Sequence, residues 1–156
     1  MNKALYVITS AMVLVSLFSE SSLSTEHTNH PQNTQKAVEY FGQELAFTTN
    51  PYGVKTAIDN QEKNILIVDV RSAEAYAKGH IPGAINIPGD QFNYFKGSHD
   101  TFPSLKKDKV HYVYCYNLLC ELGKKAAIAF AEKGYQVKEI KGGFESWEQF
   151  KYPIEK

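Results

Sequence analysis

Cys115 and Cys120 are the two cysteines of this 156-residue chain, and their side chains are the best suited to covalent chemistry. Residues 110–114, directly before Cys115, predict a strand, and a helix is expected from Leu122 onward. In a short loop between a strand and a helix, unpaired backbone N–H groups and the helix dipole favour negative charge. Both effects lower the pKa of a thiol below its free value of about 8.5, which increases the thiolate fraction. The pattern predicts a nucleophile at Cys115; the alternative is a buried structural cysteine.

Cys120 lies five residues after Cys115, and the sequence leaves three interpretations of it open. As a resolving thiol it would attack a persulfide on Cys115 or form a disulfide with it. As a small apolar residue it would pack the loop, and as a shield it would protect Cys115 from overoxidation. No second pair of Cys or His stands at the spacing of zinc ligands, so we expect no metal site.

The charge balance of the chain argues against a polyanionic partner. Lysine and arginine together number 17, aspartate and glutamate also number 17, and the formal net charge at pH 7 is +0. We therefore expect neither nucleic acid nor an anionic membrane as a partner. A content of 43% hydrophobic and 22% charged residues is that of an ordinary globular protein, and the length allows one domain.

The first 24 residues have the composition of a signal peptide. Lys3 gives a positive start and residues 4–18 are mostly apolar. Ser22 and Ser24 can occupy the small-residue positions before a cleavage site. The apolar stretch is short for a bilayer span of roughly 20 residues, and an uncleaved anchor is the alternative. We expect an exported protein, periplasmic or secreted, that is attached to a membrane only if its signal stays uncleaved. The oxidising compartment of an exported protein would permit a disulfide between the two cysteines.

The rest of the chain alternates the signals of strands and helices. Residues 25–46 are expected to hold a polar linker and an N-terminal helix that begins near Lys36, and residues 47–156 form the main domain. The continuous apolar run at 65–68 predicts a parallel strand buried on both faces. Further strands are expected at 84–87, 110–114 and 136–140, and helices at 51–60, 72–79, 122–134 and around Trp147. This alternation predicts an α/β fold with a mainly parallel sheet flanked by helices.

Three separated motifs resemble those of rhodanese domains. Residues 68–76 (VDVRSAEAY) and 79–88 (GHIPGAINIP) are similar to the two signature segments of that family. Residues 141–147 (KGGFESW) resemble its closing Gly-Gly-x-x-x-Trp motif. The resemblance extends over roughly residues 47–152 and places the first residue of the family's active-site loop on Cys115. It implies a rhodanese-like fold and a single-domain sulfurtransferase.

The activity that the resemblance implies is the transfer of sulfane sulfur through a persulfide. The Cys115 thiolate would attack the outer sulfur of thiosulfate, a persulfide or a polysulfide and hold that sulfur as a cysteine persulfide. It would then pass the sulfur to a thiophilic acceptor such as cyanide or a thiol, and a protein is a possible acceptor. No cofactor is required. The active-site loop would consist of Cys115 and the five residues after it: Tyr116, Asn117, Leu118, Leu119 and Cys120.

This loop departs from the family pattern in its charge. Many rhodanese loops read Cys-Arg-x-Gly-x-Arg, whereas here both arginines and the glycine are missing. A guanidinium fork suits an oxyanion such as thiosulfate, and Lys124 and Lys125 in the following helix would supply a weaker positive field. The bulky Leu118 and Leu119 favour a hydrophobic or less charged donor, or a protein partner.

Three polar residues of the motifs are expected to be structural rather than reactive. Asp69 and Arg71 follow a strand, and we expect them to hold neighbouring loops together through hydrogen bonds. His80 stands before a turn and is expected to bond to the backbone. Arg71 is the only arginine of the chain, so this role would remove it from oxyanion binding.

Three other functions compete with sulfur transfer: a phosphatase, a thiol–disulfide redox protein and a non-catalytic binding module. A related phosphatase activity needs an arginine six residues after the cysteine, and Glu121 stands there, so we exclude it. A thiol–disulfide redox protein would use both cysteines and would lose its activity on Cys120→Ser. A non-catalytic binding module with a rhodanese fold would form no persulfide on Cys115.

Overall fold

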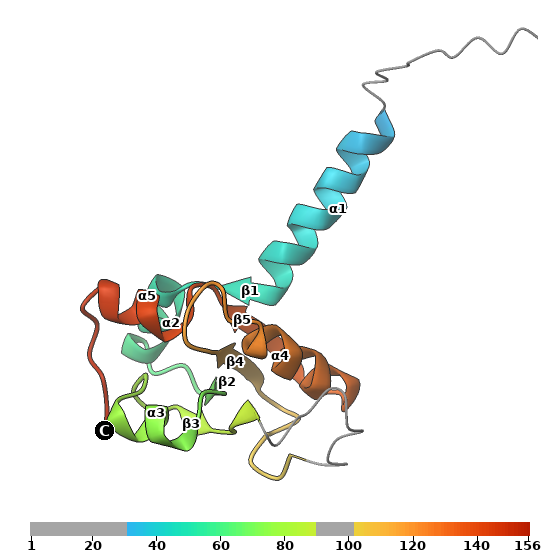
Figure 1. Cartoon of the computed structure of the whole chain (residues 1–156). Coiled ribbons are helices and arrows are strands. Elements are labelled where there is room, and N and C mark those ends of the chain that lie inside the picture. The colour runs from blue at the N-terminus through green and yellow to red at the C-terminus, as the bar shows by residue number, and fades with distance from the viewer. Residues whose placement is uncertain (1–30, 90–101) are drawn as a thin grey trace, which may run out of the picture.

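A computed structural model describes residues 31–89 and 102–156 of the chain (Figure 1). The helices within these ranges are α1 (Pro31–Phe47), α2 (Pro51–Asp59), α3 (Ala73–Lys78), α4 (Leu122–Glu132) and α5 (Gly143–Gln149). The strands are β1 (Thr48–Thr49), β2 (Ile65–Asp69), β3 (Ile85–Asn86), β4 (Val110–Tyr114) and β5 (Gln136–Ile140). The predicted signal peptide, residues 1–24, lies outside the described residues. Among those described, no helix is both long and apolar enough to cross a membrane.

The strands form one parallel sheet in the order β1-β5-β4-β2-β3. At its centre, Asp69 at the end of β2 pairs in register with Tyr114 at the end of β4. The carboxyl ends of parallel strands meet at one edge of a sheet, which is where ligands of such folds bind. Cys115 follows β4 directly and therefore lies at this edge. The predicted α/β fold with a mainly parallel sheet flanked by helices is confirmed.

Alternate residues of the central strand β2 show that both faces of the sheet are covered. Val68 packs in a core cluster with Phe130 of α4. Its neighbour Ile67 packs in a second cluster with Val54 of α2 and Trp147 of α5. Successive side chains of a strand point to opposite faces, so α4 covers one face while α2 and α5 cover the other. Cys115 belongs to the cluster on the α4 face.

The first helix, α1, extends away from the sheet (Figure 1). It begins at Pro31 rather than near Lys36, so the polar linker expected up to residue 35 is wrong for its last residues. Proline fits the first position of a helix, and the polar residues after it carry no apolar period that would have revealed the earlier start. An ion pair of 2.9 Å between Glu44 and Lys141 ties the C-terminal end of α1 to the residue that follows β5.

The segment after β2 is fixed by a local cap. Ser72 is the N-cap of α3 and accepts a hydrogen bond from the backbone N–H of Ala75 at 3.2 Å. The helix α3 that follows ends at Lys78 and is closed by Gly79, whose N–H donates to the carbonyl of Tyr76. This short helix places the segment around His80 beside the carboxyl edge of the sheet.

Candidate functional site

The loop after β4 holds a disulfide between Cys115 and Cys120, whose Cα atoms are 6.2 Å apart. Cys115 is 3% exposed, whereas Cys120 is partly exposed and packs against the core cluster on the α4 face. The disulfide that the sequence left open is therefore formed in this structure. It closes the loop directly before the first turn of α4.

The loop backbone is bound to the start of α5. The N–H of Phe144 donates to the carbonyl of Cys115, and the N–H of Glu145 donates to the carbonyl of Tyr116, both at 2.9 Å. Gly143 makes this approach possible, since its φ is 60° and an added Cβ would lie 2.6 Å from the carbonyl oxygen of Cys115. The closing Gly-Gly motif is therefore needed to bring α5 against the loop that carries the cysteine.

Asn117 gives the loop its internal turn. Its side-chain oxygen accepts from the N–H of Leu119 at 3.1 Å, and its carbonyl accepts from the N–H of Cys120 at 3.2 Å. Such bonds from an Asn side chain to the backbone two residues later stabilise tight turns. The turn leaves Leu118 and Leu119 pointing into solvent, 73% and 88% exposed. Tyr116 closes the opposite side of the loop, where its hydroxyl accepts from the N–H of Ser72 at 3.2 Å.

A small cavity of about 20 Å³ lies beside the disulfide, which is about the space of one water molecule. Three charged side chains line it: Lys124 of α4, Glu139 of β5 and Lys141. The remaining lining residues are Cys115, Asn117, Leu118, Cys120, Gly123, Ile140, Gly142 and Gly143. The sequence predicts Lys124 near the cysteine but not Glu139 or Lys141. Both follow from the parallel sheet, because the end of β5 lies beside the end of β4 at the same edge.

The charges at this cavity do not make a simple anion site. The pKa of Lys141 is raised by its hydrogen bond to Glu44, so this lysine is charged and already paired. Lys125, the second lysine expected to supply positive charge, is not among the lining residues and forms an ion pair of 3.2 Å with Glu121. Glu139 places a carboxylate on the same side of Gly123 as the cysteine. A Cβ added to Gly123 would lie 3.7 Å from Oε1 of Glu139 and 3.9 Å from the Cβ of Cys115.

Arg71 is occupied by Asp69. Its Nε lies 3.0 Å from both carboxylate oxygens of Asp69, and its Nη2 donates to Oδ2 at 2.6 Å and to the carbonyl of Gly79 at 2.7 Å. The guanidinium also lies 3.9 Å from the ring centre of Phe144. Burial opposes the charge on Arg71, but the hydrogen bond and charge of Asp69 outweigh it and raise the pKa. The guanidinium of Arg71 is thus held in a buried pair beside the loop.

His80 lies between α3 and the C-terminal segment. Its Nδ1 is 3.0 Å from the carbonyl oxygen of Tyr76, its ring stacks on the ring of Tyr76, and its Nε2 is 3.8 Å from Glu155. Its backbone N–H donates to the carbonyl of Glu155 at 2.9 Å. These contacts join the Gly79–Pro88 region to the end of the chain and do not involve the cysteine loop.

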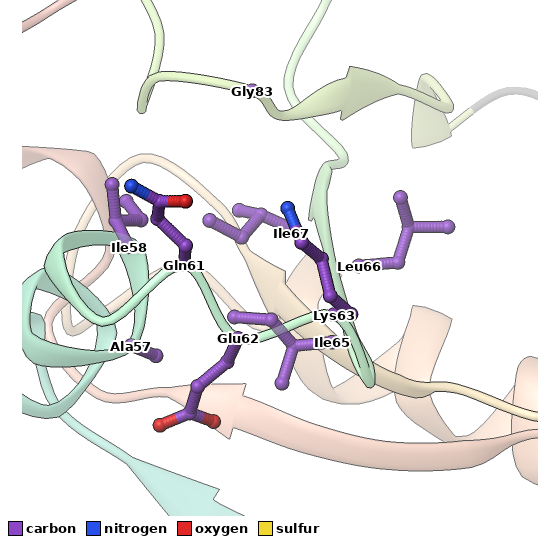
Figure 2. Close-up of a pocket in the computed structure, with 9 residues that line it drawn as sticks. All are labelled: Ala57, Ile58, Gln61, Glu62, Lys63, Ile65, Leu66, Ile67 and Gly83. Carbon is purple, nitrogen blue, oxygen red and sulfur yellow. The ribbon is translucent and has the colours of Figure 1, made fainter.

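Two larger hollows of about 350 Å³ each lie elsewhere on the domain. One borders the cysteine loop through Tyr116 and Asn117 and is also lined by Arg71 and Phe144. The other lies between the end of α2 and the start of β2, where the side chains of Gln61 and Lys63 stand at its edge (Figure 2). This second hollow is at the amino end of β2, so it is separate from the cysteine site.

The structure is that of an α/β protein with a cysteine at the carboxyl edge of a parallel sheet, in a loop that links strand to helix. The sequence model of the Rhodanese-like domain family matches residues 53–150, more than half of the chain. The chain therefore belongs to the rhodanese-like domain family, and the resemblance noted in its motifs is confirmed.

Several known proteins are similar to this chain. A crystal structure of the BH2092 protein from Bacillus halodurans is 37% identical, has a TM-score of 0.70, and covers 79% of this chain and 86% of its own. Thiosulfate sulfurtransferase GlpE of Shewanella oneidensis is 30% identical over 57% of this chain and 81% of its own length. An HTH-type transcriptional regulator of Mycobacterium tuberculosis is 32% identical over 58% of this chain, which spans only 38% of the regulator.

Proposed function

We propose that this protein is a sulfurtransferase that carries sulfane sulfur as a persulfide on Cys115. The observation that supports it most is the position of Cys115, which directly follows β4 at the ligand-binding edge of the sheet and begins a loop fixed by α5. The similarity to a thiosulfate sulfurtransferase supports the same reaction class. In the reduced protein the Cys115 thiolate attacks the outer sulfur of the donor, and the donor's remaining part leaves with the electron pair.

The charges around the cavity favour a donor with little negative charge. The loop carries no arginine, and Arg71 is paired with Asp69. Of the charged residues that line the cavity, Lys141 is paired with Glu44, and the carboxylate of Glu139 offsets the charge of Lys124. Thiosulfate carries two negative charges, which this carboxylate repels. We therefore propose a persulfide or polysulfide as the preferred donor and a thiol, small or on a protein, as the acceptor. The exposed Leu118 and Leu119 support a protein acceptor, because such apolar side chains are typical of contact surfaces.

We also propose that the protein is exported, on the basis of its first 24 residues.

The test is mass spectrometry of the reduced and desalted Cys120→Ser protein after exposure to a polysulfide, because this variant has no second thiol that removes the added sulfur. We expect the peptide that contains Cys115 to gain the mass of one sulfur atom, and Cys115→Ser to lose this gain. Absence of any gain with polysulfide, persulfide and thiosulfate would overturn the proposal.

The donor preference is tested by comparing loading rates. We expect polysulfide to load Cys115 faster than thiosulfate, and Glu139→Gln to reduce the difference between the two donors. The matched control is Glu121→Gln, since Glu121 pairs with Lys125 and does not line the cavity. Equal effects of the two substitutions would contradict a role for the Glu139 charge.

A thiol–disulfide redox protein is the second candidate, and the disulfide in this structure is the observation that favours it. This function needs both cysteines but no sulfane sulfur. It predicts exchange with a partner dithiol in the wild type and none in Cys120→Ser, with no persulfide on either protein.

A further inference from the structure

We propose that Cys120 discharges the Cys115 persulfide as hydrosulfide, so that this domain reduces sulfane sulfur to sulfide and is left as the disulfide. This inference rests on the proposed persulfide at Cys115. Its structural basis is the bond itself: the sulfur of Cys120 reaches the sulfur of Cys115 in the folded domain. The loop that brings the two together is held by Asn117 from within and by α5 from outside.

The reaction balances without a further reactant. The Cys120 thiolate attacks the inner sulfur of the persulfide, which is Sγ of Cys115. The bond between Sγ of Cys115 and the outer sulfur breaks, and the outer sulfur leaves as hydrosulfide with the electron pair. The new bond is the Cys115–Cys120 disulfide. Two cysteine thiols are thereby oxidised together, and the two electrons that they lose reduce the sulfane sulfur to sulfide.

The position of Cys120 favours this route over attack by an external thiol. Cys115 is 3% exposed, and the cavity of about 20 Å³ beside it has about the space of one water molecule. An external thiolate must first gain access to this buried sulfur, as the donor does during loading. Cys120, which is already at bonding distance, needs no such access.

The unequal exposure of the two cysteines also indicates which sulfur a reductant attacks when the disulfide is reduced. Cys120 is partly exposed and Cys115 is buried, so an external dithiol attacks Sγ of Cys120 and releases Cys115 as the thiolate. The second thiol of the reductant then closes its own disulfide and frees Cys120. Cys115 is therefore the sulfur returned for the next turnover, and a dithiol is the class of reductant that the cycle consumes.

The test uses the full-length protein, reduced, desalted and kept without oxygen or added thiol. One equivalent of glutathione persulfide is added, sulfide is trapped with bromobimane, and the forms of both cysteines are followed by mass spectrometry. We expect the wild type to release one sulfide for each disulfide formed. In Cys120→Ser we expect the Cys115 persulfide to last at least tenfold longer, with no disulfide, until dithiothreitol is added.

Two controls separate this inference from the proposed function. Cys115→Ser is expected to form neither persulfide nor disulfide, and Cys120→Ala is expected to behave like Cys120→Ser. If neither the wild type nor Cys120→Ser takes up sulfur, the proposed sulfurtransferase function fails. If both take up sulfur and their persulfides have the same lifetime, only the discharge by Cys120 is overturned. Sulfide release from the wild type without a matching disulfide also overturns it.

Discussion

Replacing Gly143 with alanine would put a methyl group against the backbone of the cysteine loop. The added Cβ would lie 2.6 Å from the carbonyl oxygen of Cys115 and 2.9 Å from the amide nitrogen of Asn117. A carbon atom does not stay so close to a backbone atom, so the loop and the start of α5 must move apart. Gly143 also has a φ of 60°, in the left-handed region that a side chain disfavours.

The size of the effect follows from these contacts. A left-handed conformation costs a residue with a side chain roughly 1–2 kcal/mol. Moving α5 away from the loop also breaks the two hydrogen bonds to the carbonyls of Cys115 and Tyr116, and each contributes about 1 kcal/mol. We therefore expect Gly143→Ala to lower the free energy of unfolding by about 3 kcal/mol. Loading of sulfur on Cys115 is expected to slow as well, because the loop loses its support.

Trp147 makes the measurement simple. It is the only tryptophan of the chain and is fully buried in α5, so its fluorescence reports unfolding in urea. We expect a lower midpoint with an unchanged slope for Gly143→Ala. The control is Gly123→Ala, which is also next to Cys115, but whose added Cβ would lie 3.7 Å from Oε1 of Glu139 and 3.9 Å from Cβ of Cys115, at ordinary contact distances. A midpoint for Gly143→Ala equal to that of the wild type or of Gly123→Ala would refute the reasoning.

Two further predictions concern buried polar groups. Arg71→Met leaves the fully buried carboxylate of Asp69 without its charged partner, so we expect the free energy of unfolding to fall by about 3–5 kcal/mol. In urea unfolding, the double variant Asp69→Asn/Arg71→Met should recover part of this loss. A loss in the double variant equal to the sum of the two single losses would contradict the pairing. Burial lowers the pKa of His111, whose Nδ1 lies 2.8 Å from the carbonyl oxygen of Gln136. The unfolded chain therefore binds a proton at higher pH than the native protein, and stability falls as the pH drops below about 6.5 toward the folded pKa. The urea midpoint should change less between pH 7.5 and 5.5 in His111→Gln than in the wild type; an unchanged pH dependence would contradict this.

The parallel sheet could be predicted because its central strands are nearly continuous apolar runs. Segment 65–68 lies within β2 and segment 110–114 coincides with β4, and their burial on two faces follows from helices on both sides. The start of α1 could not be predicted, because its first turns are polar and most of their described side chains are exposed. Residues 31–35 contain no apolar side chain besides the proline, so nothing in this first turn extends the apolar pattern that marks the rest of the helix.

The position of Cys115 could be predicted from the order of strand, loop and helix, whereas its charged surroundings could not. Glu139 and Lys141 come from the end of β5, more than 20 residues later, and reach the site only because β5 pairs with β4. The sequence contains both residues but not the strand order that brings them to the cysteine. The two lysines that were expected to supply positive charge together also differ in position. Lys124 lines the cavity, whereas Lys125 forms an ion pair with Glu121.

The structure separates two properties that a rhodanese loop combines, its shape and its charge. The shape here comes from the Asn117 turn and from the bonds of α5 to the carbonyls of Cys115 and Tyr116. Neither depends on a loop arginine or on a glycine within the loop. The missing arginines would have added positive charge to the loop, and the carboxylate of Glu139 further lowers the positive charge of the cavity beside it. Forming a persulfide requires the thiol and its loop, while holding thiosulfate requires the charge. A loop that keeps the first and lacks the second supports the proposed preference for weakly charged sulfane sulfur, and Cys120 at bonding distance supports the proposed reduction of that sulfur.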